Sequence, residues 1–350
     1  MTAGRWARWL SLTRRETRIY NMAGQSYFIT GGFGFLGQHI VKAIRDHDPL
    51  GDLRVLVRTA RRTLLGIESL PGVRLVSGDL SQPETFTAEM DGVDTVIHNA
   101  ALVSFKRRDA EALRQSNIVG TRNLLRAALD HGCRNFVFIS SISAIGRQPG
   151  RLSDETMRPD LKEKRSADFY GYTKLMGESA LQAEAGRIRG IILNPSLVLG
   201  PGSRRIEQVV SWLRWIPFFP MLTTLNSFVD VRDVAKAVVL ALTEGRSGER
   251  YIVTTENVDM LAFTRRLLAV MGKRAPVFPA PGALFALGDA LVWLLDALRL
   301  NPGLRMISAI NVDKAYSAEK IRREMGWQPD YSLEQSLRDS MLPGPVGGQA

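Results

Sequence analysis

Cysteine and histidine are scarce in this chain of 350 residues, which contains one cysteine and four histidines. The single cysteine, Cys133, excludes an internal disulfide and fits a reducing compartment, so we expect a cytoplasmic protein. Neither residue type recurs at the spacing of a metal site, and we therefore expect no bound metal. The chain has no internal repeat and no low-complexity segment, and its 45% apolar and 23% charged residues are typical of a globular protein.

A basic platform for nucleic acid is missing, although the formal net charge is +11. The cationic residues are scattered along the chain and do not interleave with aromatic residues, so we expect no nucleic acid partner. Phosphate groups of a cofactor or a substrate would use a few of these charges. An anionic membrane surface is an alternative partner for others.

No apolar run is long enough, without interruption, to cross a membrane. Residues 281–300 come nearest, but Asp289, Asp296 and Arg299 interrupt them, so we interpret them as an amphipathic helix over a substrate site. Residues 1–24 form a basic extension that lacks the apolar core of a secretory signal. This extension either lies on a membrane surface as a short amphipathic helix or precedes a natural start at Met22, which we favour. Peripheral membrane contact thus stays open as an alternative.

A glycine-rich turn near the start of the chain carries the strongest signal. Residues 27–30 are an apolar run typical of a buried parallel strand, and residues 35–45 have a helical pattern. Between them, glycines recur at the spacing of a dinucleotide fingerprint, which keeps side chains away from the helix N-terminus where a pyrophosphate binds. The nucleotide site predicted here includes Gly31, Gly34, Phe35, Leu36 and Gly37.

Strand and helix patterns alternate after this turn, and the longest helical pattern covers residues 109–129. This alternation predicts an α/β fold, with a Rossmann-type doubly wound parallel sheet. The further strands are expected at residues 53–57, 73–77, 94–98, 135–140, 191–194 and 251–254.

The composition and pattern of the chain change after residue 199, and this change indicates two domains. We expect the nucleotide-binding domain at residues 25–199, and a smaller, interleaved and mostly helical substrate lobe at residues 200–340. Residues 228–254 are expected to return to the first domain. Residues 341–350 are rich in Gly and Pro and are expected to form a flexible tail.

The end of the second strand bears on the choice of cofactor. NAD-binding folds place an acidic residue there for the ribose hydroxyls, but this chain has Arg58, which attracts a 2′-phosphate. We therefore predict NADP rather than NAD, with a solvated basic loop as the alternative interpretation of Arg58. Asp79, after the third strand, would either reach the adenine edge of the cofactor or cap a helix.

A tyrosine and a lysine stand four residues apart in Tyr170-Gly-Tyr-Thr-Lys174, at the start of a helical pattern. On one helix face, the lysine ammonium would stabilise a phenolate and allow Tyr170 to exchange a proton near neutral pH. Ser140, Ser141 and Ser143 follow the fifth strand, at the sheet edge where ligands of such folds bind. A Tyr-x-x-x-Lys pair alone is also common on solvated helices, so its weight comes from the glycine turn and these serines.

Several shorter motifs accompany the glycine turn and the Tyr–Lys pair. They are Gly78-Asp79-Leu80, His98-Asn-Ala-Ala101, Asn117-Ile-Val-Gly-Thr121, Asn194-Pro-Ser196 and Phe228-Val-Asp-Val-Arg-Asp233. Together the motifs resemble the extended short-chain dehydrogenase/reductases. That group includes NAD-dependent epimerase/dehydratases, 3β-hydroxysteroid dehydrogenases and dihydroflavonol-4-reductase-like enzymes.

The resemblance, which covers about residues 25–340, implies roles for individual residues. Ser141 would orient the substrate oxygen, Tyr170 would be the general acid/base, and Lys174 would lower the pKa of the tyrosine and bind the nicotinamide ribose. The chain departs from the family pattern at Arg58 and at Asn194, where an arginine is usual. The resemblance also places near the cofactor or the substrate Asp79, Leu80, Ala100, Ala101 and Ser143, and it makes Asn117 a support within its helix.

The sequence therefore predicts an NADP(H)-dependent oxidoreductase that transfers a hydride to or from a carbinol or carbonyl carbon. Trp212, Trp215 and Phe218 crowd into a stretch broken by prolines and would line an apolar pocket. The expected substrate is a hydrophobic alcohol or ketone of steroid, terpenoid or acyl type. Two alternatives stay open: an NAD-dependent sugar-nucleotide epimerase or dehydratase, and a non-catalytic NADP-sensing protein. Both a monomer and a homodimer fit the sequence.

Overall fold

The structure is a computed structural model of the chain. It describes residues 24–60, 62–147, 151–162, 165, 168–221, 223–280 and 313–341. The expectations for the basic extension and for residues 281–300 lie outside these residues, as does nearly all of the tail. In the described part of the chain, no helix is both long and apolar enough to cross a bilayer.

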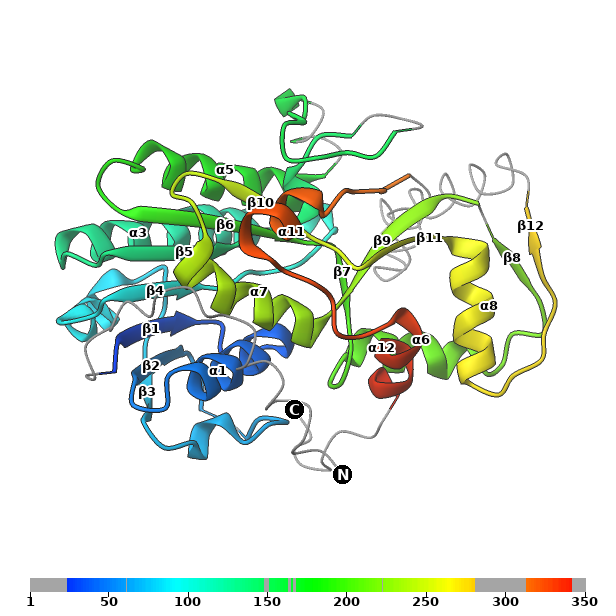
Figure 1. The fold of residues 1–350 in the computed structure, drawn as a ribbon, viewed down its shortest axis with the longest axis horizontal. Coiled ribbons are helices and arrows are strands. Elements are labelled where there is room, and N and C mark those ends of the chain that lie inside the picture. Colours follow the sequence, from blue (N-terminus) through cyan, green and yellow to red (C-terminus); the bar gives the residue numbers. More distant parts are fainter. Residues whose placement is uncertain are drawn as a thin grey trace.

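A seven-stranded parallel sheet forms the centre of the molecule, in the order β10-β6-β5-β4-β1-β2-β3 (Figure 1). The chain passes from β1 outward to β3 and then returns to the other side of β1 through β4, so the strand order reverses between β1 and β4. Ligands of open α/β sheets bind beyond the carboxyl ends of strands at such a switch point. The strands are β1 (Ser26–Thr30), β2 (Asp52–Val57), β3 (Val73–Ser77), β4 (Thr95–His98), β5 (Asn135–Ile139), β6 (Arg189–Pro195) and β10 (Arg250–Val253).

Helices cover both faces of this sheet. On one face lie α1 (Phe35–His47) and α7 (Val231–Glu244), and on the other lie α3 (Gly120–Asp130) and α5 (Phe169–Ala183) (Figure 1). Side chains of β1 alternate between the two cores, with Ile29 on the α1 side and Phe28 on the α3 side. The doubly wound Rossmann-type fold predicted from the sequence is confirmed.

The long helical pattern before β5 is not one regular α-helix. It comprises α2 (Ala110–Leu113), a π-helical segment (Arg114–Val119) and then α3. A π-helical insertion turns the side chains that follow it relative to those before it, and such segments are frequent at functional sites. This segment buries the side chains of Asn117 and Ile118.

The smaller lobe contains short strands that the sequence did not predict. A three-stranded sheet has the order β11-β9-β7, and β8 pairs in parallel with β12. Because most of these strands have only three or four residues, their patterns are too short to recognise. The elements are β7 (Leu197–Leu199), α6 (Arg204–Leu213), β8 (Phe219–Met221), β9 (Leu225–Asp230), β11 (Glu256–Asp259), α8 (Met260–Val270), β12 (Val277–Pro279) and α12 (Leu333–Ser340).

The two parts of the chain are interleaved. After β9 the chain forms α7 and β10 on the large sheet, and α11 (Glu319–Met325) packs on these two elements. Trp327 follows α11, is fully buried, and donates its indole N–H to the carbonyl oxygen of Asp233 at 3.0 Å. The chain therefore crosses between the lobes several times, and neither lobe is a separate sequence segment.

Candidate active site

The turn between β1 and α1 leaves the N-terminus of α1 bare. Gly31 has a φ of 69°, and a Cβ atom there would lie 2.6 Å from the amide nitrogen of Ala100. A Cβ atom on Gly37 would lie 2.0 Å from the carbonyl oxygen of Gly31. Gly34 caps α1 without a side-chain hydrogen bond, and the first turn holds no acidic residue. This cradle fits a cofactor pyrophosphate, because the helix end is positive and no side chain blocks it.

A chain of hydrogen bonds connects this turn to the next helix layer. The hydroxyl of Thr30 lies 2.7 Å from Nδ1 of His98, and Nε2 of His98 lies 2.8 Å from Oγ1 of Thr121. The Thr121 hydroxyl donates its one proton to the carbonyl oxygen of Asn117, so it can only accept from His98, which must carry its proton on Nε2. Nδ1 of His98 then accepts from the Thr30 hydroxyl, which itself accepts from the amide of Ala100. Burial lowers the pKa of His98 to about 3, and Lys174 adds to this effect, so the ring is neutral.

Asn117 joins the end of β4 to the start of α5. Its side chain accepts from the amide of Leu102 at 2.8 Å and donates to the carbonyl oxygen of the same residue at 2.9 Å. It also donates to Oγ1 of Thr173 at 3.1 Å, and Thr173 donates to the carbonyl oxygen of Tyr170 at 2.7 Å. The position of Tyr170 is therefore tied to the strand end that carries Ala100 and Ala101.

Tyr170 and Lys174 lie one turn apart at the start of α5, which Asp168 caps by accepting from the amide of Gly171. The Lys174 ammonium donates to the carbonyl oxygen of Ile139 at 2.7 Å and lies 4.8 Å from the ring centroid of Phe138. Burial lowers the pKa of Lys174 to about 7, while Glu178 acts in the opposite direction. A lysine so perturbed, beside a tyrosine at the carboxyl edge of the sheet, is typical of an active site.

The serines after β5 point in different directions. Ser140 is buried and donates to Oε1 of Glu178 at 2.5 Å. The hydroxyl of Ser141 instead accepts from the amide of Ser143 at 3.1 Å, and both Ser141 and Ser143 are half-buried. Of the two adjacent serines, Ser141 is therefore the one whose hydroxyl lies outside the buried polar cluster.

Sequence reasoning missed a buried polar cluster behind Ser141 and Lys174. Asn194, whose role the sequence left open, donates both to the carbonyl oxygen of Ser141 at 2.9 Å and to Oε1 of Glu178 at 2.6 Å. The other oxygen of Glu178 accepts from Arg250 at 3.3 Å, and both side chains are almost fully buried. One signal was available, because Glu178 stands four residues after Lys174 on the same helix face.

The basic and acidic residues at the ends of β2 and β3 lie close enough to influence each other. Arg58 is exposed, and its charge contributes to the lowered pKa of Asp79. The larger cause is Ser81, whose amide and hydroxyl both donate to Oδ1 of Asp79 at 2.8 Å. Asp79 thus caps a turn rather than an α-helix. The carbonyl oxygen of the next residue, Leu80, accepts from Asn123 at 2.9 Å.

Two of the aromatic residues expected to line the substrate pocket, Trp215 and Phe218, lie away from Tyr170. Trp212 belongs to α6, but its side chain lies outside the described part of the structure. Trp215 is 87% exposed, and Phe218 is 52% exposed and stacks on Phe278 with centroids 6.3 Å apart. Both adjoin β8 and β12, at the opposite end of the molecule from α3 and α5 (Figure 1).

A different apolar group borders the tyrosine. The ring of Phe105 packs edge-on against Tyr170, with centroids 6.0 Å apart. Leu102 and Val103 precede it in the segment between β4 and α2, and all three side chains are more than a third exposed. This group could not be predicted from the sequence, because the segment has neither a helical nor a strand pattern.

The parallel sheet, the glycine turn and the Tyr170–Lys174 pair define an extended short-chain dehydrogenase/reductase. The chain belongs to the NAD dependent epimerase/dehydratase family, whose model matches residues 27–254. A Synechocystis sp. protein named as a candidate dihydroflavonol 4-reductase is 32% identical over 90% of this chain and 93% of its own length. Human 3β-hydroxysteroid dehydrogenase type 7 is 28% identical, with 90% of this chain and 94% of the relative covered.

A solved structure resembles the whole architecture. The crystal structure of a protein called gox2253 superposes with a TM-score of 0.76 and 26% sequence identity, covering 91% of this chain and 97% of that chain. The sequence-based assignment to the extended short-chain dehydrogenase/reductases is thus confirmed, and a nicotinamide dinucleotide is the cofactor of the family.

Proposed function

We propose that the protein transfers a hydride between NADP(H) and a hydrophobic secondary alcohol or ketone. The observation that carries the proposal is the buried Lys174 one turn from Tyr170, at the sheet edge that also holds the bare glycine turn. A bound nicotinamide would supply or accept the hydride. The residues around it would position the substrate and move one proton.

The cofactor would extend along the carboxyl edge of the sheet. Its phosphates would bind the bare start of α1, at Gly34, Phe35 and Leu36, while Ala100 and Ala101 would line its middle. At the end of β2, Arg58 is exposed and available for a 2′-phosphate, which supports NADP over NAD. Lys174 lies at the other end of this edge, where it would bind the nicotinamide ribose.

Tyr170 would hold or release the proton on its phenolic oxygen as the substrate oxygen gains or loses charge. The Lys174 ammonium favours the phenolate form by its charge, and it acts in a buried site where such an effect is strong. The Ser141 hydroxyl would donate to the substrate oxygen, and its backbone is fixed for this by Asn194.

The apolar group of Leu102, Val103 and Phe105 supports a hydrophobic substrate, because all three are exposed and Phe105 packs against Tyr170. The relatives agree in kind, since one is named as a hydroxysteroid dehydrogenase and another as a candidate dihydroflavonol reductase. Each methylene buried against this group would add about 0.8 kcal/mol of binding. Activity should therefore rise along a series of ketones of increasing chain length.

Absorbance of NADPH with such a ketone series tests the proposal. We expect kcat/KM to climb with chain length, and Tyr170→Phe to lower turnover by about a hundredfold or more while cofactor binding persists. Tyr172→Phe is the matched control, because that ring stacks on Phe169 and has no lysine one turn on. Turnover of a sugar nucleotide in place of ketones would favour an epimerase or dehydratase. Cofactor binding without any turnover would favour a sensing protein.

The cofactor preference has its own test. Arg58→Asp replaces a charge-assisted contact to the 2′-phosphate, worth about 1.5–3 kcal/mol, with repulsion. The affinity for NADPH should therefore fall by at least about tenfold, while that for NADH holds or improves. Fluorescence titration with both cofactors measures this. Equal affinities for NADPH and NADH in the unaltered protein would contradict the NADP assignment.

A further inference from the structure

The outer end of the smaller lobe exposes an unusual number of large apolar side chains. The turn between α6 and β8 carries Trp215, Ile216 and Phe218, which are 87%, 40% and 52% exposed. Phe278 of the neighbouring strand β12 is 42% exposed and stacks on Phe218. We call residues 214–218 together with Phe278 the lobe tip. Exposed aromatic groups of this kind mark interaction surfaces on soluble domains.

The lobe tip is held in place by the protein rather than being a loose loop. The Lys273 ammonium donates to the carbonyl oxygens of Leu213 at 2.6 Å, Arg214 at 2.9 Å and Ile216 at 2.6 Å. All three of its donors are thereby used to fix the turn that carries Trp215. The parallel pairing of β8 with β12 fixes Phe218 beside Phe278. The exposure of these rings is therefore a property of the fold.

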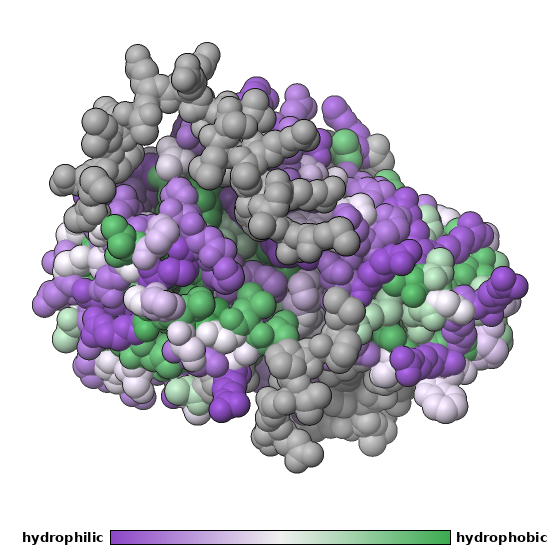
Figure 2. Space-filling model, turned by 60° about the horizontal axis from the view of Figure 1, so that its bottom comes forward, coloured by the Kyte–Doolittle hydropathy of each residue, from purple (hydrophilic) through white to green (hydrophobic). Residues whose placement is uncertain are grey.

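The two stretches of sequence that form and support the lobe tip carry charges of one sign. Residues 208–222 and 265–280 contain no Asp or Glu, and their cationic residues are Arg214, Arg265, Arg266, Lys273 and Arg274. Arg266 pairs with Glu256 and Glu334, but Arg214 and Arg274 are exposed and have no carboxylate partner among the described residues. Hydrophilic and hydrophobic side chains accordingly lie side by side at this end of the molecule (Figure 2).

We propose that the lobe tip docks onto the surface of an anionic lipid bilayer. Trp and Phe side chains enter the interfacial region of a membrane, while arginines at the same level bind lipid phosphates. A second copy of the chain fits less well, because a symmetric contact through the lobe tip would place the unpaired Arg214 and Arg274 of one copy against those of the other. A small anion would satisfy the charges but would leave Trp215 in water. The docking does not depend on the proposed reaction.

Sedimentation of the full-length protein with vesicles tests the proposal. We expect binding to phosphatidylcholine vesicles that contain phosphatidylglycerol, weaker binding to phosphatidylcholine alone, and a loss of binding as salt is raised. Trp215→Ser should lower the vesicle affinity. Arg214→Glu combined with Arg274→Glu should lower it by at least about tenfold, since each basic residue near such a surface contributes about 1 kcal/mol.

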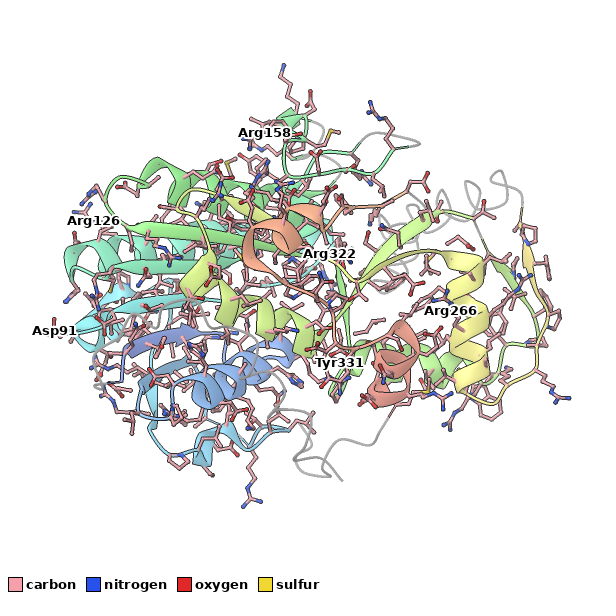
Figure 3. All side chains as sticks on the ribbon, viewed as in Figure 1. Asp91, Arg126, Arg158, Arg266, Arg322 and Tyr331 are labelled. Carbon is pink, nitrogen blue, oxygen red and sulfur yellow. The ribbon has the colours of Figure 1, made fainter. Side chains whose placement is uncertain are left out.

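Matched controls lie at the other end of the molecule. Arg126 of α3 is highly exposed, and Figure 3 labels it far from α8. Arg122→Glu combined with Arg126→Glu makes the same change of charge there, since both arginines are exposed on α3, and Leu50→Ser removes a side chain that is 72% exposed. Both controls should bind vesicles like the unaltered protein.

Three outcomes would overturn the proposal. The first is that the unaltered protein does not bind anionic vesicles. The second is that the controls lose as much binding as the tip variants, which would indicate a general effect of positive charge. The third is that Trp215→Ser leaves vesicle binding unchanged and converts a dimer to a monomer in solution, which would make the tip an interface between two copies.

Discussion

Glu178 illustrates how a single buried charge organises the candidate site. Its carboxylate accepts from Ser140, Asn194 and Arg250, and burial raises its pKa while these partners act against that. Through Asn194 it fixes the backbone of Ser141, and through space it favours the charged form of Lys174. In the proposed reaction, Glu178 would thus be a positioning residue that acts on both groups without taking part in the chemistry.

Glu178→Gln should change the pH profile as well as the rate. Without the negative charge, Lys174 would lose its proton at lower pH, so the alkaline limb of kcat should move to lower pH. Activity at pH 8 should fall about tenfold, since one unit of pKa changes the protonated fraction by that factor above the pKa. The control is Glu184→Gln, at the end of α5, where the carboxylate pairs with Arg187 on the surface. A lower kcat with an unmoved alkaline limb would indicate a purely structural role.

At the scale of the elements, the β1–α1 connection depends on backbone conformation and on close approach. Position 31 requires glycine for both reasons. Its φ is 69°, and a side chain there would meet the backbone of Ala100 just after β4. Gly92 has the same φ, but a Cβ atom there would meet nothing within 4 Å. The two positions therefore separate the effect of backbone conformation from that of contact.

Gly92→Ala should destabilise the protein by about 1–2 kcal/mol, the usual cost of an L-residue in the left-handed region. Gly31→Ala should be worse by at least about 1 kcal/mol, because its methyl group collides with the amide of Ala100. It should also weaken NADPH binding, whereas Gly92→Ala should not. Urea denaturation and fluorescence titration measure the two effects. Equal losses of stability at both positions would refute the close-approach argument.

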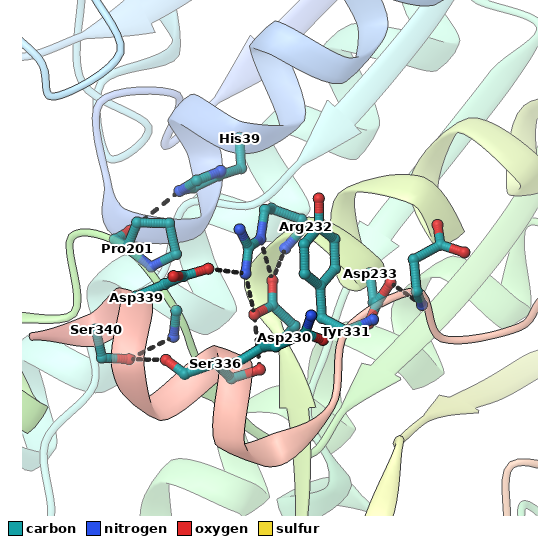
Figure 4. A network of polar contacts seen from close by, with 12 residues as sticks. His39, Pro201, Asp230, Arg232, Asp233, Tyr331, Ser336, Asp339 and Ser340 are labelled. Atoms are coloured by element: carbon teal, nitrogen blue, oxygen red, sulfur yellow. Dashed lines mark hydrogen bonds and ion pairs between the residues drawn. The ribbon is translucent and has the colours of Figure 1, made fainter. Parts of the chain in front are cut away.

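At the scale of the whole molecule, a polar network connects α12, the last helix of the described residues, to both lobes (Figure 4). Asp230 is buried and accepts from the side chains of Arg232 and Ser336. The same guanidinium pairs with Asp339 at 2.7 Å. Ser340 accepts from the amide of Gly200 at 2.8 Å, which ties the end of α12 to the connection between the lobes.

The network reaches the nucleotide-binding side as well. The Nε2 atom of His39, on α1, lies 3.2 Å from the carbonyl oxygen of Pro201, the residue after Gly200. The pKa of His39 is lowered, chiefly by burial, so the ring is neutral near pH 7 and donates its Nε2 proton to that carbonyl. The network therefore holds α1, the 200–201 connection and α12 together.

Arg232→Met should destabilise the whole protein, because Asp230 would keep a buried charge without its ion partner. Removing one member of a buried pair costs about 3–5 kcal/mol, and we expect roughly 3 because Arg232 is a quarter exposed. Arg338→Met on the exposed side of α12 is the control and should change stability by less than about 0.5 kcal/mol. The free energy of unfolding in urea provides the measurement. Similar losses in both variants would argue against a role for the network.

Local features of the sequence determined the parallel sheet, the glycine turn and the Tyr170–Lys174 pair. Each depends on a short-range rule: the apolar run of a buried strand, the bare turn before a helix, and the 3.6-residue period of that helix. The strand predicted at residues 73–77 has those bounds in the structure for this reason. The family followed from the same motifs, because their combination is specific.

The tertiary structure alone decided which groups surround Lys174 and which aromatic residues are exposed. Glu178 meets Arg250 across 72 positions of the sequence, and Asn194 reaches Ser141 across 53. No periodic pattern in the sequence predicts such pairs, because they depend on how adjacent strands bring distant segments together. Likewise, the sequence identified Trp215 and Phe218 as aromatic residues but did not determine whether their rings are exposed. Whether a ring lies in a pocket or in water depends on the elements packed around it, and here the lobe tip leaves both rings outside.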